Sequence, residues 1–344
     1  MAFITSRTLA ARFSISPFAL ACYFRHGRYQ PQILKRLPAE STKLYASWSA
    51  TEQFKIRLVK TEEEFESVIT NFKVKAGWRP GLKDAECFLA CAPSGAFVGE
   101  LNGKPICCGT AVKYGDSFIF GGSYIVSNEY RGKGYGRMFL DGLSRMISSR
   151  RIAISAQLHY EEMYKRKGFR SQFYGARFDF HLPTAMTRFS EISEKCPLEI
   201  KCIEEVNLEA LSVYDTTVFG FERQAFLSKW LRVPGSHARV AIDSEGSVVG
   251  YTVAQPMFVK EEGYQIGPLF ADSEAIAERL LKAVFEELLQ EQPAPPVFID
   301  APTKKATEMG ERLQGKRWFE HVYMVMNDIP DARFDKWFGI TILG

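Results

Sequence analysis

The sequence predicts an α/β protein in which two domains follow one another and share the same order of strands and helices. From about residue 52 onwards, segments typical of strands are interleaved with segments of helical periodicity, and their order recurs after about residue 198. A loop with three glycines and three cations joins a strand to a helix in the first repeat and is missing from the second. These observations predict two related folds with different binding chemistry.

Caps and turns mark the elements of the first repeat. Thr61 precedes three acidic residues, which is typical of a helix start, and Asn102-Gly103 between two alternating segments indicates a hairpin. The expected elements are strands at 54–59, 96–101, 105–112, 117–126, from 152, and at 173–180, with helices from 61, at 82–90, from the glycine loop to about 149, and ending at 168.

The second repeat follows a connection at 183–197. A hairpin is expected around Ser244-Glu245-Gly246, and the segment from Ser273 has the periodicity of an amphipathic helix. The expected elements are strands at 198–203, 238–243, 247–254, 264–270, 297–300 and 321–326, with helices at 208–214, 222–231, 273–289 and 306–314.

The glycine loop between Arg131 and Arg137 predicts a site for a phosphate-bearing ligand. Its glycines let successive backbone N–H groups converge on one point, and the helix that follows adds its positive end. A P-loop would need a Ser or Thr after Gly-Lys, and a dinucleotide fingerprint would need G-x-G-x-x-G with an acidic residue about 20 positions later. The sequence has neither. A surface turn with solvated cations is the alternative.

The pattern V-x-x-x-x-R-G-x-G-x-G, with Val126 and Arg131 in register, resembles the acetyl-CoA loop of the GNAT superfamily of N-acetyltransferases. The resemblance implies that the strand before the loop binds pantetheine through its backbone and that the loop amides hold the pyrophosphate. It also implies that the backbone N–H of Val126 polarises the thioester carbonyl. The implied cofactor-binding residues are Tyr124, Ile125, Val126, Arg131, Gly132, Lys133, Gly134, Tyr135, Gly136 and Arg137.

The segment from Met163 to Phe169 is similar to the L-Y-x-K-x-G-F segment that ends a helix in the same superfamily. The resemblance implies that Tyr164 is the general acid that protonates the departing thiolate, and Gly168 is expected to end the helix. A packing tyrosine at a helix end is the alternative. Where the family often has an asparagine, this chain has Gln157.

The whole arrangement resembles the YitH/holothin-acyltransferase type of tandem GNAT protein over about residues 54–344. The resemblance implies an α/β fold of two GNAT-like mixed-sheet domains in tandem. Residues 52–185 would form the catalytic domain that binds acetyl-CoA, and residues 198–344 a GNAT-like domain without the loop. The second repeat has Asp272 at the corresponding place, and we expect it to cap the next helix and to repel a pyrophosphate.

The general base is open at this point, because the strand before the loop carries no glutamate. For Glu100 a solvated carboxylate, and for His159 a surface histidine, are the alternatives to a catalytic role. The candidates are Glu100, His159, Glu162 and, from the second repeat, Asp215.

For the acceptor we expect a contribution from the second repeat. A cation and an acid beside a glycine turn can bind an amine or a carboxylate, although a helix start with a structural salt bridge is the alternative. The expected acceptor-binding residues are Trp78, Asp215, Glu222 and Arg223.

The implied reaction is transfer of an acetyl group from acetyl-CoA to the amine of a small molecule, by direct attack in a ternary complex. Protein-lysine acetylation and binding of coenzyme A without catalysis are the alternatives. No metal is expected, because the seven cysteines show no zinc-like spacing. The oligomeric state stays open.

Residues 1–50 form a basic segment that differs from the rest of the chain. They hold seven cations and one acid and are rich in serine, which is typical of a mitochondrial transit peptide. We therefore expect the mitochondrial matrix and otherwise the cytoplasm, with a disordered basic tail as the alternative. The remainder has 37 cations against 39 acids, which disfavours nucleic-acid binding. No apolar run approaches the ~20 residues that span a bilayer.

Overall fold

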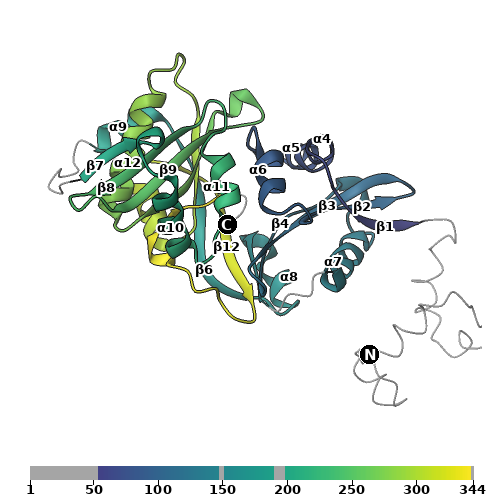
Figure 1. Cartoon of the computed structure of the whole chain (residues 1–344). Helices are drawn as coiled ribbons and strands as arrows, with labels where there is room; N and C mark the ends of the chain where they lie inside the picture. Colours follow the sequence, from purple (N-terminus) through teal and green to yellow (C-terminus); the bar gives the residue numbers. More distant parts are fainter. Residues whose placement is uncertain (1–52, 147–150, 190–197, 342–344) are drawn as a thin grey trace, which may run out of the picture. The chain divides into compact units, whose positions relative to one another are not determined.

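The computed structural model describes residues 53–146, 151–189 and 198–341 (Figure 1). The expected transit peptide, residues 1–50, lies outside the described residues. In the described part no helix is long and apolar enough to cross a membrane.

The first half of the chain contains the expected strands and helices. Thr61 Oγ1 accepts a hydrogen bond from the N–H of Glu64, and Asn102 and Gly103 turn the hairpin with φ angles of 52° and 80°. The strands are β1 (Phe54–Leu58), β2 (Ala96–Leu101), β3 (Lys104–Tyr114), β4 (Phe118–Val126), β5 (Arg151–Gln157) and β6 (Arg170–Phe180). The helices are α4 (Glu62–Phe65), which continues through the π-helical η3 (Glu66–Thr70) into α5 (Asn71–Lys75), then α6 (Asp84–Cys91), α7 (Tyr135–Met146) and α8 (Glu161–Lys165).

The second half follows the same order and ends with one further short strand. Its strands are β7 (Leu198–Cys202), β8 (His237–Asp243), β9 (Val248–Pro256), β10 (Tyr264–Ala271), β11 (Val297–Ala301), β12 (Lys316–Met326) and β13 (Trp337–Gly339). Its helices are α9 (Leu182–Phe189), which precedes β7, then α10 (Leu208–Phe219), α11 (Gln224–Trp230), α12 (Glu274–Leu288) and α13 (Lys304–Arg312).

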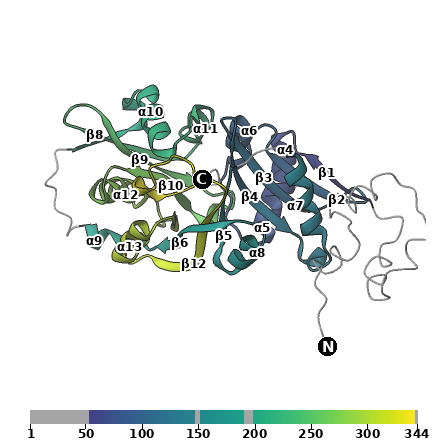
Figure 2. The ribbon, with the colours of Figure 1, turned by 90° about the horizontal axis from the view of Figure 1, so that it is seen from below.

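The two halves exchange strands and share one sheet. The strand order is β1-β2-β3-β4-β5-β12-β6-β11-β10-β9-β8-β7, with β13 paired to β10. Strand β12 therefore lies between β5 and β6 (Figures 1 and 2), and β6 pairs with β12 and β11 of the second half. The expected boundary between residues 185 and 198 separates the repeats along the chain, but the sheet crosses it. Neither half forms a continuous sheet from its own strands alone.

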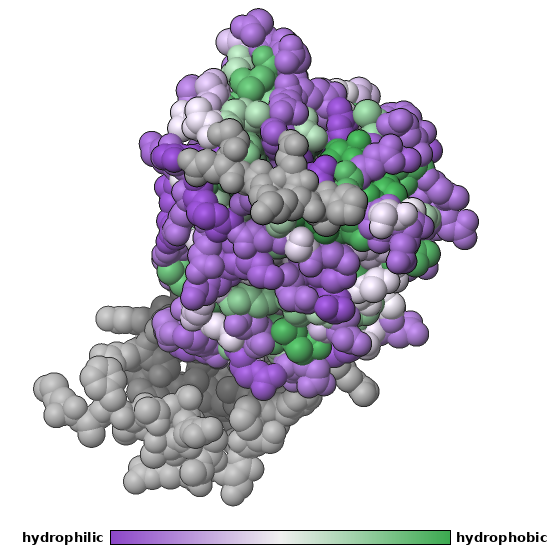
Figure 3. Space-filling view, turned by 90° about the vertical axis from the view of Figure 1, so that its left-hand side faces the viewer, coloured by the Kyte–Doolittle hydropathy of each residue, from purple (hydrophilic) through white to green (hydrophobic). Residues whose placement is uncertain are grey.

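The main hydrophobic core also draws on both halves. Phe118 and Phe120 pack in one cluster with Tyr323 and Trp337, all nearly inaccessible to solvent. The rings of Tyr114 and Phe219 meet across the halves with centroids 5.0 Å apart. Since each buried large apolar side chain contributes roughly 1.5–3 kcal/mol, the halves stabilise each other. The outer face of the second half is mostly hydrophilic (Figure 3).

Candidate cofactor and acceptor site

The end of β4 forms one side of a fork in the sheet. β4 and β5 pair in parallel from Phe118 to Gly121, and no pair between them follows in the described residues. Just beyond, Ser123 and Tyr124 together oppose a single residue of β3, and Ser123 has a φ of 48°. Such a bulge bends its strand. Strand β4 therefore leaves β5 at this point.

The backbone of Val126 faces into this fork. The N–H of Ser127 donates to the carbonyl oxygen of Ile106 on β3 at 2.9 Å. Because successive N–H groups of a strand point to opposite edges, the N–H of Val126 points toward the fork. The Val126 carbonyl oxygen accepts a hydrogen bond from Arg131 Nε at 2.9 Å. Arg131 thus ties the glycine loop to the open edge of β4.

The glycine loop leads directly into helix α7. Gly132 and Gly134 have φ angles of 73° and 89°, in the region that favours glycine, and their Cα positions face open space. The helix starts at Tyr135, and the N–H of Met138 donates to the Gly134 carbonyl. The amides of the first turn lack an acceptor within the helix. They and the helix dipole suit an anion.

Gly136 brings α7 close to the fork. A Cβ atom at this position would lie 2.2 Å from Tyr124 Oη and 3.1 Å from Val126 Cγ2. Any larger residue would push the start of the helix away from β4, so this glycine sets the distance between the phosphate loop and the fork.

Cations surround the loop on its exposed side. Lys133 and Lys104 both lie above the ring of Tyr130, at 5.5 and 5.4 Å from its centroid. Arg137 is 83% exposed and lies 3.6 Å from Asp141. Hydrogen bonds to Tyr130 and Glu129 raise the pKa of Lys104. Lys104 is not among the residues expected from the sequence, because the hairpin between β2 and β3 brings it to the loop from a distant position in the chain.

Tyr164 lies on the other side of the fork, on α8. It packs on a cluster that contains Ile154 and Ala156 of β5 and Val322 and Met324 of β12. Burial raises the pKa of Tyr164 to about 12, so the phenol stays protonated at neutral pH. Burial raises the pKa of Tyr124, and Tyr164 adds to this effect.

The corresponding fork of the second half is filled by the protein itself. β10 and β11 pair from Tyr264 to Ile266, and further along β10 pairs with β13 instead, at Leu269 and Phe270. The N–H of Ile340 donates to the carbonyl oxygen of Asp300 on β11 at 3.1 Å. The segment from β13 to Ile340 therefore occupies the space in which the first half has an open fork.

Two comparisons with known families follow this division into halves. Residues 62–169 match the acetyltransferase (GNAT) family, and residues 211–339 match the acetyltransferase (GNAT) domain. The chain carries two GNAT domains in tandem. The open fork and the glycine loop lie in the amino-terminal GNAT domain, and the filled fork lies in the carboxy-terminal one.

Relatives agree with a tandem GNAT acyltransferase. The chain is 26% identical to holothin acyltransferase of Pseudoalteromonas sp. (strain SANK 73390) over 236 residues, which cover 69% of this chain and 75% of the relative. It is 24% identical over 172 residues to an uncharacterized protein of Caenorhabditis elegans, covering 48% of this chain and 54% of that protein.

Solved structures share the fold. A putative acetyltransferase from Pyrococcus horikoshii superposes with a TM-score of 0.62 at 20% identity, covering 85% of this chain and 96% of its own. A tandem GNAT protein from the clavulanic acid biosynthesis pathway gives a TM-score of 0.57 at 12% identity, covering 79% of this chain and 98% of its own.

The acidic candidates for the general base are engaged in ion pairs. Glu100 lies 2.7 Å from Arg57, and β3 separates its strand from β4, so this carboxylate is structural and not placed at the fork. Glu162 lies 3.0 Å from Lys165. His159 follows β5 and is exposed, with its ring against that of Tyr160 at 3.8 Å between centroids.

Asp215 and Arg223 are not acceptor-binding residues. Both side chains are fully buried, with two hydrogen bonds of 2.8 Å between them. The left-handed turn at Gly220 ends α10 and folds Arg223 back onto it. This corrects the expectation from sequence, since an acceptor cannot reach the pair. Glu222 is exposed and Trp78 packs partly buried against the main core.

Asp272 does not cap a helix, contrary to the expectation from the sequence. Ser273 caps α12 instead, because its side chain accepts a hydrogen bond from the N–H of Ile276. The Asp272 carboxylate accepts hydrogen bonds from Tyr214 Oη at 2.8 Å and Lys336 Nζ at 2.7 Å. Lys336 directly precedes β13, so Asp272 helps to hold the filled fork closed.

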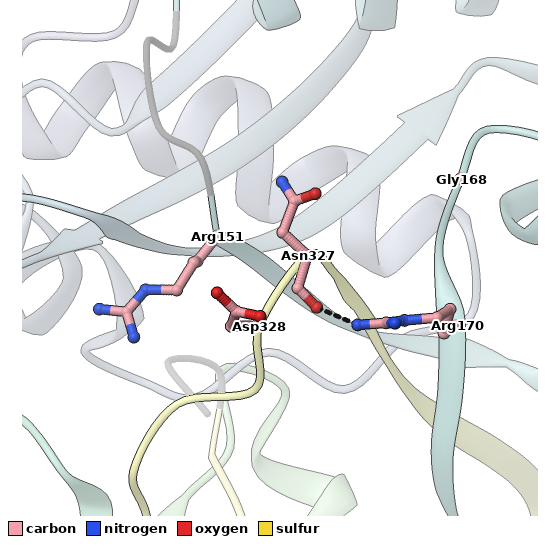
Figure 4. Close-up of a pocket in the computed structure, with 5 residues that line it drawn as sticks. All are labelled: Arg151, Gly168, Arg170, Asn327 and Asp328. Atoms are coloured by element: carbon pink, nitrogen blue, oxygen red, sulfur yellow. Dashed lines mark hydrogen bonds between the residues drawn. The ribbon is translucent and has the colours of Figure 1, made fainter.

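A pocket of about 660 Å³ lies elsewhere on the shared sheet (Figure 4). It is lined by Arg151, Gly168, Arg170, Asn327 and Asp328. Arg151 begins β5, whereas the fork opens at Ser155, four residues further along that strand and roughly 13 Å away at the usual rise per residue. This pocket is separate from the fork. In the described part of the chain no group of His, Cys, Asp and Glu side chains could hold a metal.

Proposed function

We propose that this tandem GNAT acyltransferase moves an acetyl group from acetyl-CoA to the amine of a small molecule. The observation that carries the proposal is the open fork of the amino-terminal domain, which has the Val126 N–H on one edge, the glycine loop at its mouth and Tyr164 beside it. In this proposal the loop amides and cations bind the pyrophosphate. The free edge of β4 binds the pantetheine arm.

The chemical steps follow from these positions. The amine nitrogen attacks the thioester carbonyl carbon while the Val126 N–H donates to the carbonyl oxygen as it gains negative charge. The carbon–sulfur bond then breaks, and the Tyr164 hydroxyl gives its proton to the thiolate. The nitrogen loses a proton to a base, and the phenol recovers one from solvent.

The position of the carboxy-terminal domain favours a small molecule over a protein as the acceptor. Its strand β12 extends the sheet beside β5. Phe221 of the same domain stacks on Tyr114 and Phe118 near the start of β4, and Phe219 meets the Tyr114 ring edge to face. These contacts cover part of the sheet that leads to the fork. A protein substrate would need that face to be open. The relative is named holothin acyltransferase, and we extend acyl transfer from it to this chain, with a small amine as the acceptor.

The test compares two glycines with the same strain. Gly134 and Gly246 both have positive φ angles, 89° and 82°, and both face open space. Gly134→Ala and Gly246→Ala should therefore cost similar stability, about 1 kcal/mol. We expect Gly134→Ala to weaken acetyl-CoA binding at least tenfold and Gly246→Ala to leave it unchanged, as measured by calorimetry on the full chain.

Turnover is measured as release of free thiol with a panel of small amines and with lysine-containing peptides. Release with small amines supports the proposal, and release with peptides alone would indicate a protein-lysine acetyltransferase. Coenzyme A binding without any release would show a non-catalytic protein.

A further inference from the structure

Ser155 is the first residue of β5 beyond its last pair with β4. Its neighbours Ile154 and Ala156 point to the face of the sheet that carries Tyr164. Because side chains alternate along a strand, Ser155 points to the opposite face, where it is exposed. A thioester held in the fork would therefore have Tyr164 on one side of the sheet and Ser155 on the other.

His321 lies next to Ser155, although it comes from the carboxy-terminal domain. The exchanged strand β12 places His321 opposite Gln157, and His321 Nδ1 lies 3.3 Å from Ser155 Oγ. The ring is 4% exposed, and its buried Nε2 has no hydrogen-bond partner among the described residues. A hydrogen on Nε2 leaves Nδ1 free to accept the Ser155 hydroxyl proton.

A glycine on the neighbouring strand makes room for this ring. A Cβ atom on Gly175 of β6 would lie 2.6 Å from His321 Cε1 and 2.2 Å from the carbonyl oxygen of Ala301. Any other residue at 175 would displace the imidazole. The position of His321 therefore depends on strands from both domains.

The surroundings keep the imidazole neutral. Burial lowers the pKa of His321, with Asp300 of β11 opposing the effect and Arg177 of β6 adding to it. Asp300 is itself held by Arg177 through two hydrogen bonds of 2.7 Å. Ser155 on β5 and the backbone of Ala301 on β11, which also opposes the effect of burial, are the other polar groups at the ring. The free base is thus the form present at pH 7.

We propose that Ser155 contacts the acceptor amine and that His321, acting through Ser155 as a positioning residue, receives its proton. The inference rests on the proposed acetyl transfer and supplies the base that the sequence left open. As the nitrogen bonds to the carbonyl carbon, its N–H proton passes to Ser155 Oγ and the hydroxyl proton passes to His321 Nδ1. The thiolate takes its proton from Tyr164 on the other face, and His321 later releases one proton to solvent.

The experiment measures kcat/KM against pH for the full chain with acetyl-CoA and the best amine. We expect wild-type activity to fall below about pH 6.5, where a histidine of ordinary or lowered pKa takes up a proton. His321→Gln keeps a group that can accept from Ser155 but cannot titrate. It should lower kcat about 10²-fold, the lower range for loss of a general base. It should also remove the fall in kcat/KM at low pH, which is the acid limb of the profile.

Ser155→Ala is the second variant, and it should fold normally because the side chain is exposed. It should also lower kcat about 10²-fold and remove the acid limb, with the Kd for acetyl-CoA unchanged. The matched control is His181→Gln, an exposed histidine that pairs with Thr184. It should keep both the rate and the limb.

An unchanged acid limb in Ser155→Ala, with wild-type kcat, would overturn the relay, whether or not His321→Gln folds. Absence of thiol release from the wild-type protein would instead sink the proposed transfer itself. A readout without turnover is the proton NMR titration of the His321 ring. It should show protonation below pH 6.5 and a shift of that midpoint in Ser155→Ala, and an unaltered midpoint would contradict the contact.

Discussion

Removal of the Arg223 guanidinium tests whether the Asp215–Arg223 pair is structural or binds the acceptor. Arg223→Met retains much of the aliphatic stem but removes the guanidinium, which lies over the rings of Phe219, Phe226 and Phe270. The Asp215 carboxylate then stays buried with Tyr251 as its remaining partner. Loss of one member of a buried pair costs about 3–5 kcal/mol, because the other charge stays uncompensated. At about 2–4 °C per kcal/mol for a domain of this size, the melting temperature should fall by roughly 6–20 °C.

The assay is thermal unfolding, together with the KM for the amine at a temperature where the variant is folded. Arg232→Met is the matched control, because Arg232 is exposed nearby and its loss should change the melting temperature by less than 2 °C. The double variant Asp215→Leu/Arg223→Met removes both charges and should recover part of the lost stability. A normal melting temperature with a raised KM for the amine would refute the structural assignment and restore the pair as an acceptor site.

Three further predictions concern the fork and the amino-terminal segment. Tyr164→Phe should lower kcat about 10²-fold without changing the Kd for acetyl-CoA. The control Tyr174→Phe, at an exposed position, should change neither value. No loss of wild-type activity is expected up to pH 10, because burial raises the pKa of Tyr164 to about 12. Trp337→Ala should destabilise the protein by about 3–5 kcal/mol in urea unfolding, more than the 47% exposed Trp318→Ala, and equal midpoints would show that β13 contributes little to the filled fork. Residues 1–50 fused to a fluorescent protein should direct it to mitochondria in eukaryotic cells, and a cytoplasmic signal would favour the basic-tail alternative.

Local signals predicted the elements of this fold well. The Thr61 cap, the Asn102-Gly103 turn and the glycine loop each depend on neighbours in sequence, and the structure confirms all three. The position of Gly168, with a φ of 97° after α8, also agrees with its expected place at a helix end. Such features are encoded by a few adjacent residues, so one sequence suffices to find them.

Long-range pairing could not be predicted in the same way. Nothing in the period-2 pattern of 321–326 says that this strand joins β5 of the other domain, since an alternating strand fits any sheet with an apolar face. The burial of Asp215 and Arg223 could not be predicted for a related reason. A charged pair beside a glycine turn looks the same in sequence whether it lies on the surface or in the core, and the surrounding aromatic rings come from distant elements.

The exchange of strands also sets the order in which a growing chain can complete its chemistry. Ser155 and His321 are 166 residues apart, so the ribosome makes the glycine loop and Tyr164 long before the strand that flanks β5 exists. Pairing over such separations is slow compared with local contacts, and domains usually fold as soon as they emerge. Here the sheet of the amino-terminal domain stays incomplete between β5 and β6 until β12 has left the ribosome. A chain that ends before about residue 316 would carry every expected cofactor-binding residue but would lack β12, the strand beside the fork. Premature termination should therefore yield inactive protein.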